Sequence, residues 1–446
     1  MVKKQEVKGK SKRVKKYHIL LLVLFLFLLG GIVVQHRYGT KSKLHRKIEE
    51  FRAAGYPVSL KELDKLYSIP EGAENAADLI MDAISDYNEP NDSSVLDIAG
   101  GINPRPLPEE IIKSATTYLK NNQKSLELLH KAGVLKFFRY PANISAGQTP
   151  KLFNIQKMVK LLCVDAVINA ENGDSEAAAK SLLNSFSIVN SLSDVPFSIG
   201  QHCRMVYLED SILSLEHIIN TIDYNDEQLA QLFKTMADKQ RLSGISYGFT
   251  GELCQAISQF EDIMASNEPF RDLSFSQRLF YSVYKSVGLI ESDCVIYLDI
   301  LDKYIKAGKL PLEKRLDADK QIKNETSNIS RIHVELKGAF TLYSRFFSDE
   351  LVSISRLRTA LAALAIQRYR LKNNKLPDSL SNLVPEYLDS VPSDPFNGKE
   401  LRYKKLDSGF VVHSVDQDLI DDGGQEEPKK RQQKVLRYDI TFTIKK

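Results

Sequence analysis

The chain has 446 residues, of which 43% are hydrophobic, and its formal net charge is +4. Hydrophobic content of this size can form one large core or two ordinary ones. Most of the excess positive charge lies in the N-terminal tail, so the rest is near neutral and we expect no nucleic-acid partner.

The four cysteines have no Cys-x-x-Cys spacing, which argues against zinc or thioredoxin-like chemistry. Each lies in an apolar helical context, so we expect buried thiols, with one or two disulfides as the alternative. They are Cys163, Cys203, Cys254 and Cys294.

An uncharged apolar run, Ile19–Val34, dominates the N-terminal part of the chain. A helix from Tyr17 to Gln35 would rise about 28 Å, close to a hydrocarbon core of about 30 Å. We therefore predict a basic cytoplasmic tail over 1–17 and a transmembrane anchor over 18–35. A cleaved signal peptide is the alternative, although no Ala-x-Ala-like cleavage site follows the run.

The charges on the two sides of this run bear on its orientation. Eight Lys and Arg residues precede it, and six lie between residues 37 and 52. This small excess favours a cytoplasmic N-terminus. We expect a single-pass protein of the cell inner membrane with its bulk outside the cytoplasm.

Residues 36–150 are predicted to hold juxtamembrane helices and a loop. Lys41–Ala54 reads as a continuation of the anchor helix, and Gly55-Tyr56-Pro57 ends it. Asn88–Pro108 contains four prolines and Gly100-Gly101, which is typical of a loop.

Residues 151–306 are predicted to form a helical body. Two apolar-periodic segments meet at Asn172-Gly173-Asp174, as in the helical hairpins of tetratricopeptide repeats, with Asp174 as an N-cap. No strict 34-residue recurrence follows, so a bundle of hairpins is favoured over a true repeat array. The last helix is expected to span 275–306, and 307–347 is expected to be a linker or a helix.

Residues 348–446 are predicted to form a small α+β domain. A helix from Glu350 to about Lys372 is followed by three extended runs, 401–405, 409–415 and 438–444. In the last run apolar residues alternate with threonines, as in a half-buried strand. The predicted fold class is therefore mainly α, with one transmembrane helix, a helical-hairpin body and a C-terminal helix on a three-stranded antiparallel sheet.

Several motifs in this last region resemble the major pseudopilin of type II secretion. They are Ala365–Pro377 at the end of a long helix, Val391–Gly398 with its Ser-Asp-Pro-Phe, Gly409–Asp418, and Asp421–Gly424. The resemblance implies a pseudopilin-like fold for this domain. The whole layout also resembles uncharacterised bacterial membrane-anchored helical proteins.

The same resemblance implies a calcium site after the second strand. Ca²⁺ takes six to eight oxygen ligands, which carboxylates crowded into one turn can supply. An insertion, Gln425–Leu436, separates the turn from the last strand and brings additional cations. A solvated acidic turn is the alternative. The candidate ligands are Asp416, Asp418, Asp421, Asp422 and Asp439.

Catalytic motifs are weak. Gly244-Ile245-Ser246-Tyr247-Gly248 fits Gly-x-Ser-x-Gly, but no parallel-sheet pattern surrounds it. We therefore expect a non-enzymatic interaction or assembly protein of the bacterial envelope, which binds the membrane and other envelope proteins. The alternative is an envelope hydrolase with Ser246 as its nucleophile.

Overall fold

The computed structural model describes most of the chain and is mainly helical, with a small antiparallel sheet. It describes 2–101, 106–237, 244–265, 274–330, 345–425 and 438–446, with His333, Leu336, Phe340 and Tyr343; for 2–16 and 19 it describes the backbone alone. The chain divides into two compact units. The first contains 1–59, 253–302 and 328–339, and the second 60–252, 303–327 and 340–446.

The first unit is built on a long N-terminal helix, α1 (Val2–Ala53). Its apolar part is long and apolar enough to span a membrane, and none of its most apolar window is buried by the described residues. Beyond this part the helix packs against α12 (Leu289–Ala307). Arg37 pairs with Glu291 at 3.3 Å, and Lys47 with Asp302 at 2.9 Å, so the two helices run side by side in the same direction.

The segment predicted as a single helix over 275–306 is two helices, which corrects that expectation. α11 (Phe275–Ser286) ends at Gly288, where φ is +82°, and α12 begins at the next residue. A Cβ at Gly288 would lie 3.2 Å from Arg37 Cα. A side chain would strain the backbone and crowd α1, so glycine is needed at the break.

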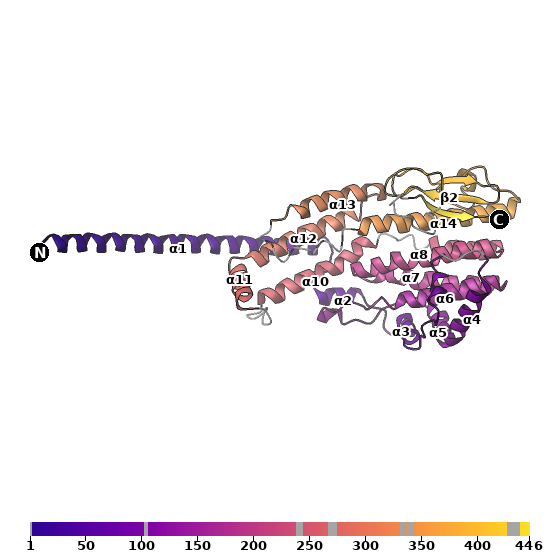
Figure 1. Cartoon of the computed structure of the whole chain (residues 1–446), viewed down its shortest axis with the longest axis horizontal. Helices are drawn as coiled ribbons and strands as arrows, with labels where there is room; N and C mark the ends of the chain where they lie inside the picture. The colour runs from indigo at the N-terminus through magenta and orange to yellow at the C-terminus, as the bar shows by residue number, and fades with distance from the viewer. Residues whose placement is uncertain are drawn as a thin grey trace. The chain divides into compact units, whose positions relative to one another are not determined.

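The second unit is a set of packed helices, most of them visible in Figure 1. Its larger α-helices before the sheet are α4 (Glu109–Asn121), α5 (Gln123–Gly133), α6 (Ile155–Glu171), α7 (Ser175–Ser191), α8 (Ser198–Thr221), α9 (Asp226–Ala237), α13 (Leu312–Ser327) and α14 (Phe346–Asn373). The shorter elements are α2 (Leu60–Leu66), α3 (Ala76–Ser85), η1 (Ser93–Asp97), η2 (Ile144–Ala146), η3 (Leu192–Asp194) and η5 (Leu380–Leu383). Helix α10 (Ile245–Ala265) begins in this unit and ends in the first.

The predicted hairpin junction between α6 and α7 is confirmed. Gly173 takes φ +80°, and the Asp174 side chain accepts a hydrogen bond from Ala177 N at 2.9 Å. The two helices pack along their lengths and are buried in the core of the unit.

Helix α14 organises the C-terminal part of the second unit. It contacts α8, α9, β2 and β3, and it lies beside the sheet in Figure 1. Seventeen of its residues are buried, since it is covered on more than one side. Helix α13 is highly charged, yet it buries Arg315, Asp319 and Ile322, which recur at helical spacing.

The sheet has three antiparallel strands in the order β1 (Arg402–Lys405), β2 (Phe410–Ser414), β3 (Ile440–Ile444). The outer edge of β3 is covered by side chains of α8. Glu216 accepts from Thr443 N at 2.9 Å, and Asn220 donates to Thr443 O at 2.9 Å. The three predicted strands are therefore present, and both backbone groups of Thr443 on the outer edge of β3 are hydrogen-bonded.

The four cysteines are buried, and none forms a disulfide. Burial raises the pKa of the Cys163 thiol to about 12, which keeps it protonated and unreactive. The structure therefore agrees with the prediction of buried thiols.

Candidate metal centre

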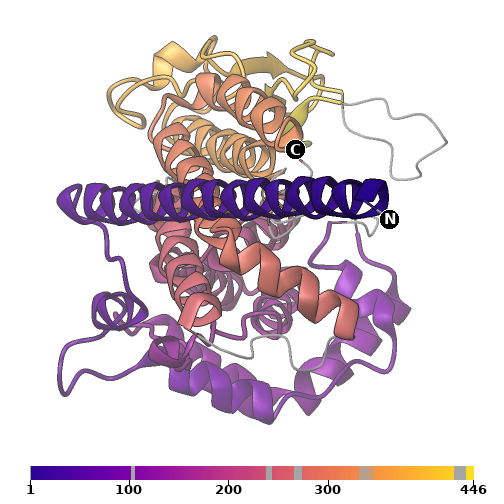
Figure 2. The ribbon, with the colours of Figure 1, turned by 90° about the vertical axis from the view of Figure 1, so that its left-hand side faces the viewer.

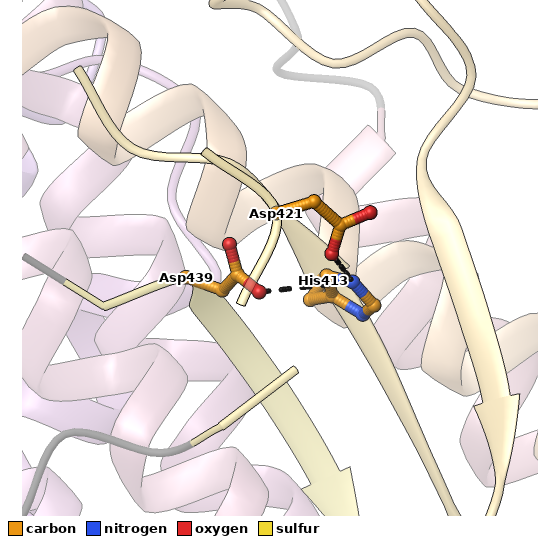
Figure 3. A group of neighbouring side chains, drawn as sticks. All are labelled: His413, Asp421 and Asp439. Atoms are coloured by element: carbon orange, nitrogen blue, oxygen red, sulfur yellow. Dashed lines mark hydrogen bonds and ion pairs between the residues drawn. The ribbon is translucent and has the colours of Figure 1, made fainter. Parts of the chain in front are cut away.

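The candidate site lies beside the sheet, where the turn after β2 approaches the start of β3 (Figure 3). His413 on β2, Asp421 in the turn and Asp439 just before β3 each offer one atom that could bind a metal, and the two aspartates face the histidine. These three atoms lie within 4.8 Å of one another. Such a cluster could hold a metal ion.

The closest contacts in the cluster involve His413 Nε2. It lies 3.1 Å from Asp421 Oδ1 and 3.8 Å from Asp439 Oδ2. The same two oxygens accept backbone hydrogen bonds, from Gly423 N at 3.0 Å and from Gly424 N at 2.9 Å. Asp421 Oδ1 therefore contacts both Gly423 N and His413 Nε2, whereas Asp439 Oδ2 accepts from Gly424 N and keeps lone-pair capacity for another partner.

The local backbone explains why the turn folds back onto the strand. Leu419 takes φ +61°, and Gly423 and Gly424 take φ +74°. A Cβ on Gly424 would lie 3.0 Å from His413 Nδ1 and 3.1 Å from Val411 Cγ1. Because Gly424 has no side chain, the turn can lie against β2 and bring Asp421 to the histidine.

Arg402 on β1 connects the cluster to the buried Asp394. Its Nε lies 2.7 Å from Asp421 Oδ2, and its Nη1 donates to Asp394 Oδ2 at 2.9 Å. Asp394 also accepts hydrogen bonds from Phe396 N and Val415 N, both at 3.0 Å. Asp394 of the Ser-Asp-Pro-Phe motif therefore fixes the end of β2 through its hydrogen bonds.

The two aspartates of the cluster have pKa values shifted in opposite directions. Burial raises the pKa of Asp421, but hydrogen bonds from Gly423 and His413 and the charge of Arg402 outweigh it, so that pKa is lowered. The pKa of Asp439 is raised, chiefly by burial and also by the negative charges of Asp421 and Asp422. A bound cation would favour the ionised form of both groups.

The structure brings together only two of the five predicted ligands. Asp418 is exposed, and its Oδ1 accepts from Ile420 N at 3.1 Å. Asp416 and Asp422 are half-buried and fall outside the cluster. The insertion is described only at Gln425, so the rest of it, 426–436, lies outside the described residues.

Sequence reasoning missed His413. The available signal was a histidine inside the apolar run Phe410–Val415, which the structure shows to be buried in and after β2. A polar ring at such a position needs a partner. Its presence changes the chemistry, because Ca²⁺ prefers oxygen ligands whereas an imidazole nitrogen suits Zn²⁺ and other transition metals.

Ser246, the candidate nucleophile, lies in the first turn of α10. Its Oγ donates to Ile305 O at 3.1 Å, and Thr250 Oγ1 donates to Ser246 O at 3.3 Å. The hydroxyl hydrogen is thus used to attach the start of α10 to a neighbouring backbone.

Comparisons with protein-family models, with curated proteins and with solved structures found no match to this chain.

Proposed function

We propose that this chain is a single-pass membrane protein that works at the bilayer surface as a non-enzymatic interaction or assembly protein. The observation that carries the proposal is the apolar part of α1, whose side chains the described residues leave uncovered. Burying one Leu, Phe or Val side chain stabilises by about 1.5–3 kcal/mol. A bilayer would remove all the apolar side chains of the run from water at once.

Residues at both ends of the run support this placement. Tyr17 and Tyr38 are exposed on α1 just outside it, where tyrosine rings suit the membrane–water interface. The excess of basic residues before the run favours a cytoplasmic N-terminus in an inner membrane, with the folded part outside the cytoplasm.

The pseudopilin-like motifs support assembly over catalysis, because pseudopilins act by assembling with other subunits. In the same domain we propose a divalent-cation site, with calcium as the cation that the resemblance implies. The approach of Asp421 to Asp439 supports a site at this turn. The cation would join the turn to the start of β3 and remove the repulsion between the two carboxylates.

Alkaline carbonate extraction of membranes tests the anchor. We expect the full-length protein to stay in the pellet. A Leu22→Arg/Leu26→Arg variant should move to the supernatant, since each central arginine costs about 2.5–3.5 kcal/mol on insertion. The matched control is Val134→Arg/Phe153→Arg, at two exposed apolar residues of the second unit, which should stay in the pellet.

Intact mass of the pelleted protein separates an anchor from a cleaved signal peptide. An anchor gives a mature chain that retains α1. A mature N-terminus after Gln35, or release of the full-length protein by carbonate, would contradict the proposal.

A further inference from the structure

Helix α11 carries an apolar face that the described residues leave exposed. Phe275, Leu279 and Val283 recur every four residues and are 77%, 57% and 55% exposed. Phe280 is also exposed and lies at the edge of this face, on the side toward Tyr284, whose ring centroid is 5.6 Å from its own. The opposite side of the helix packs on its own unit through Tyr284, which is buried and donates to Asp293 Oδ2 at 2.7 Å. The exposed residues therefore form a continuous apolar stripe.

The C-terminal end of α11 is attached to α1 just beyond the apolar run. His36 Nδ1 lies 3.2 Å from Val287 O, and Gly288 lies against Arg37. Arg37 in turn pairs with Glu291. If α1 spans a bilayer, these contacts hold the end of α11 at the level of the lipid headgroups, because residues 36 and 37 directly follow the membrane-spanning stretch.

The orientation and the charge of α11 match those of a helix that lies at the level of the lipid headgroups. The helix lies across the direction of α1 rather than alongside it, as both views of the ribbon show (Figures 1 and 2). Its charged residues are Arg278 and Lys285, and it has no acidic residue. Basic residues beside an apolar face are typical of helices that lie in the plane of a membrane interface.

We propose that α11 is an interfacial helix whose apolar face, Phe275, Leu279, Phe280 and Val283, enters the headgroup layer of the bilayer that α1 spans. This inference rests on the proposed membrane anchor. It assigns the face to lipid and not to a second protein, because the helix is tied to the point where the anchor leaves the membrane. The first unit would then touch the bilayer at two places, and its tilt relative to the membrane would be restricted.

Single-tryptophan variants test the proposal directly, because the chain has no tryptophan. The full-length protein is reconstituted in vesicles of phosphatidylcholine and phosphatidylglycerol, with or without a brominated phosphatidylcholine that quenches tryptophan in contact with lipid. The probe is Leu279→Trp. The matched control is Arg278→Trp, one residue earlier and so about 100° away around the helix. The reference for the anchor is Phe25→Trp.

We expect brominated lipid to remove most of the fluorescence of both Phe25→Trp and Leu279→Trp, and much less of that of Arg278→Trp. The emission of Leu279→Trp should also lie at shorter wavelength than that of Arg278→Trp. Far-UV circular dichroism checks that each variant is folded.

Three outcomes would overturn the proposal. If Phe25→Trp is quenched and Leu279→Trp is not, the anchor stands and α11 does not enter the membrane. If Leu279→Trp is shielded from aqueous acrylamide but not quenched by brominated lipid, the face is covered by protein. If Phe25→Trp itself is not quenched, the membrane anchor fails and this inference fails with it.

Discussion

Arg37 Nε on α1 lies 3.3 Å from Glu291 Oε1 on α12, and the side chain of Glu291 is only 1% exposed. Replacing Arg37 with methionine would leave a buried carboxylate without its partner. Because Arg37 itself is 37% exposed, we expect a loss of unfolding free energy above that of a surface pair, about 1 kcal/mol, and below that of a fully buried pair, about 3–5 kcal/mol. Thermal unfolding in detergent micelles measures the change.

A matched control for this prediction is Arg52→Met, because Arg52 and its partner Glu49 are both exposed on the same helix. Its cost should stay below about 1 kcal/mol. Adding Glu291→Gln to Arg37→Met should recover part of the loss, since the buried charge is then removed. Equal losses for Arg37→Met and Arg52→Met would show that the burial of Glu291 does not make its ion pair more stabilising than an exposed one.

Glu350 gives the second unit a predictable pH dependence. Burial raises the pKa of Glu350 to about 7, against the opposing charges of Arg315 and Arg204. The folded state therefore holds a proton that the unfolded state releases near pH 4.5. We expect the unfolding free energy to fall by about 3 kcal/mol from this group as pH rises from about 4.5 to about 7, and to level off above that.

Equilibrium unfolding of the full chain across this pH range tests the assignment to Glu350. Glu350→Gln should flatten the dependence, whereas Glu127→Gln, at an exposed position on α5, should leave it unchanged. A wild-type profile that rises from pH 5 to pH 8 with no loss on Glu350→Gln would refute it.

The cation proposal predicts a melting temperature that depends on divalent ions. A ligand at a hundredfold excess over its Kd stabilises the folded state by about 2.7 kcal/mol. The full chain should melt higher in millimolar calcium than in chelator, and magnesium should do less because it requires a tighter octahedron. Asp439→Asn should abolish the increment.

Two further variants separate the ligand sets. Asp418→Ala abolishes the calcium increment if Asp418 is a ligand, as the resemblance implies, and leaves it intact if the ligands are those around His413. His413→Gln should spare a calcium effect but remove any larger stabilisation by Zn²⁺, for which imidazole is a good ligand. No dependence on any of these ions would leave the turn as a hydrogen-bonded cluster without metal.

Topology can be tested with one engineered thiol, because the four native cysteines are buried. Asn91→Cys introduces a thiol at an exposed position. A membrane-impermeant reagent should label it in cells with a permeabilised outer layer and an intact inner membrane. Ser11→Cys, before the anchor, should react only after lysis, and the reverse pattern would invert the proposed orientation.

Local signals predicted much of the secondary structure. Asp174 caps α7 as predicted, and Asn225 and Gln228 form a reciprocal capping pair at the start of α9. The alternation of Ile440, Phe442 and Ile444 marked β3 correctly. These features depend on near neighbours in the sequence, so one sequence is enough to recognise them.

The candidate site was less predictable because it depends on contacts between distant residues. Asp418 and Asp421 are close in sequence, but the positive φ of Leu419 turns the chain between them and sends them in different directions. Asp421 instead contacts His413 across the turn. It also lies near Asp439, from which the insertion separates it in the sequence. Similarly, the break at Gly288 became clear only from its close approach to α1.

The cover that α8 places on β3 has a consequence for dissecting the protein. Thr443 is bound by Glu216, 227 residues earlier in the chain, and by Asn220. A fragment limited to 348–446 would lack α8 and expose an unpaired strand edge, which promotes edge-to-edge aggregation. Recombinant work on the sheet therefore requires a chain that includes α8, because the side chains of that helix occupy the strand edge at which two copies could otherwise pair.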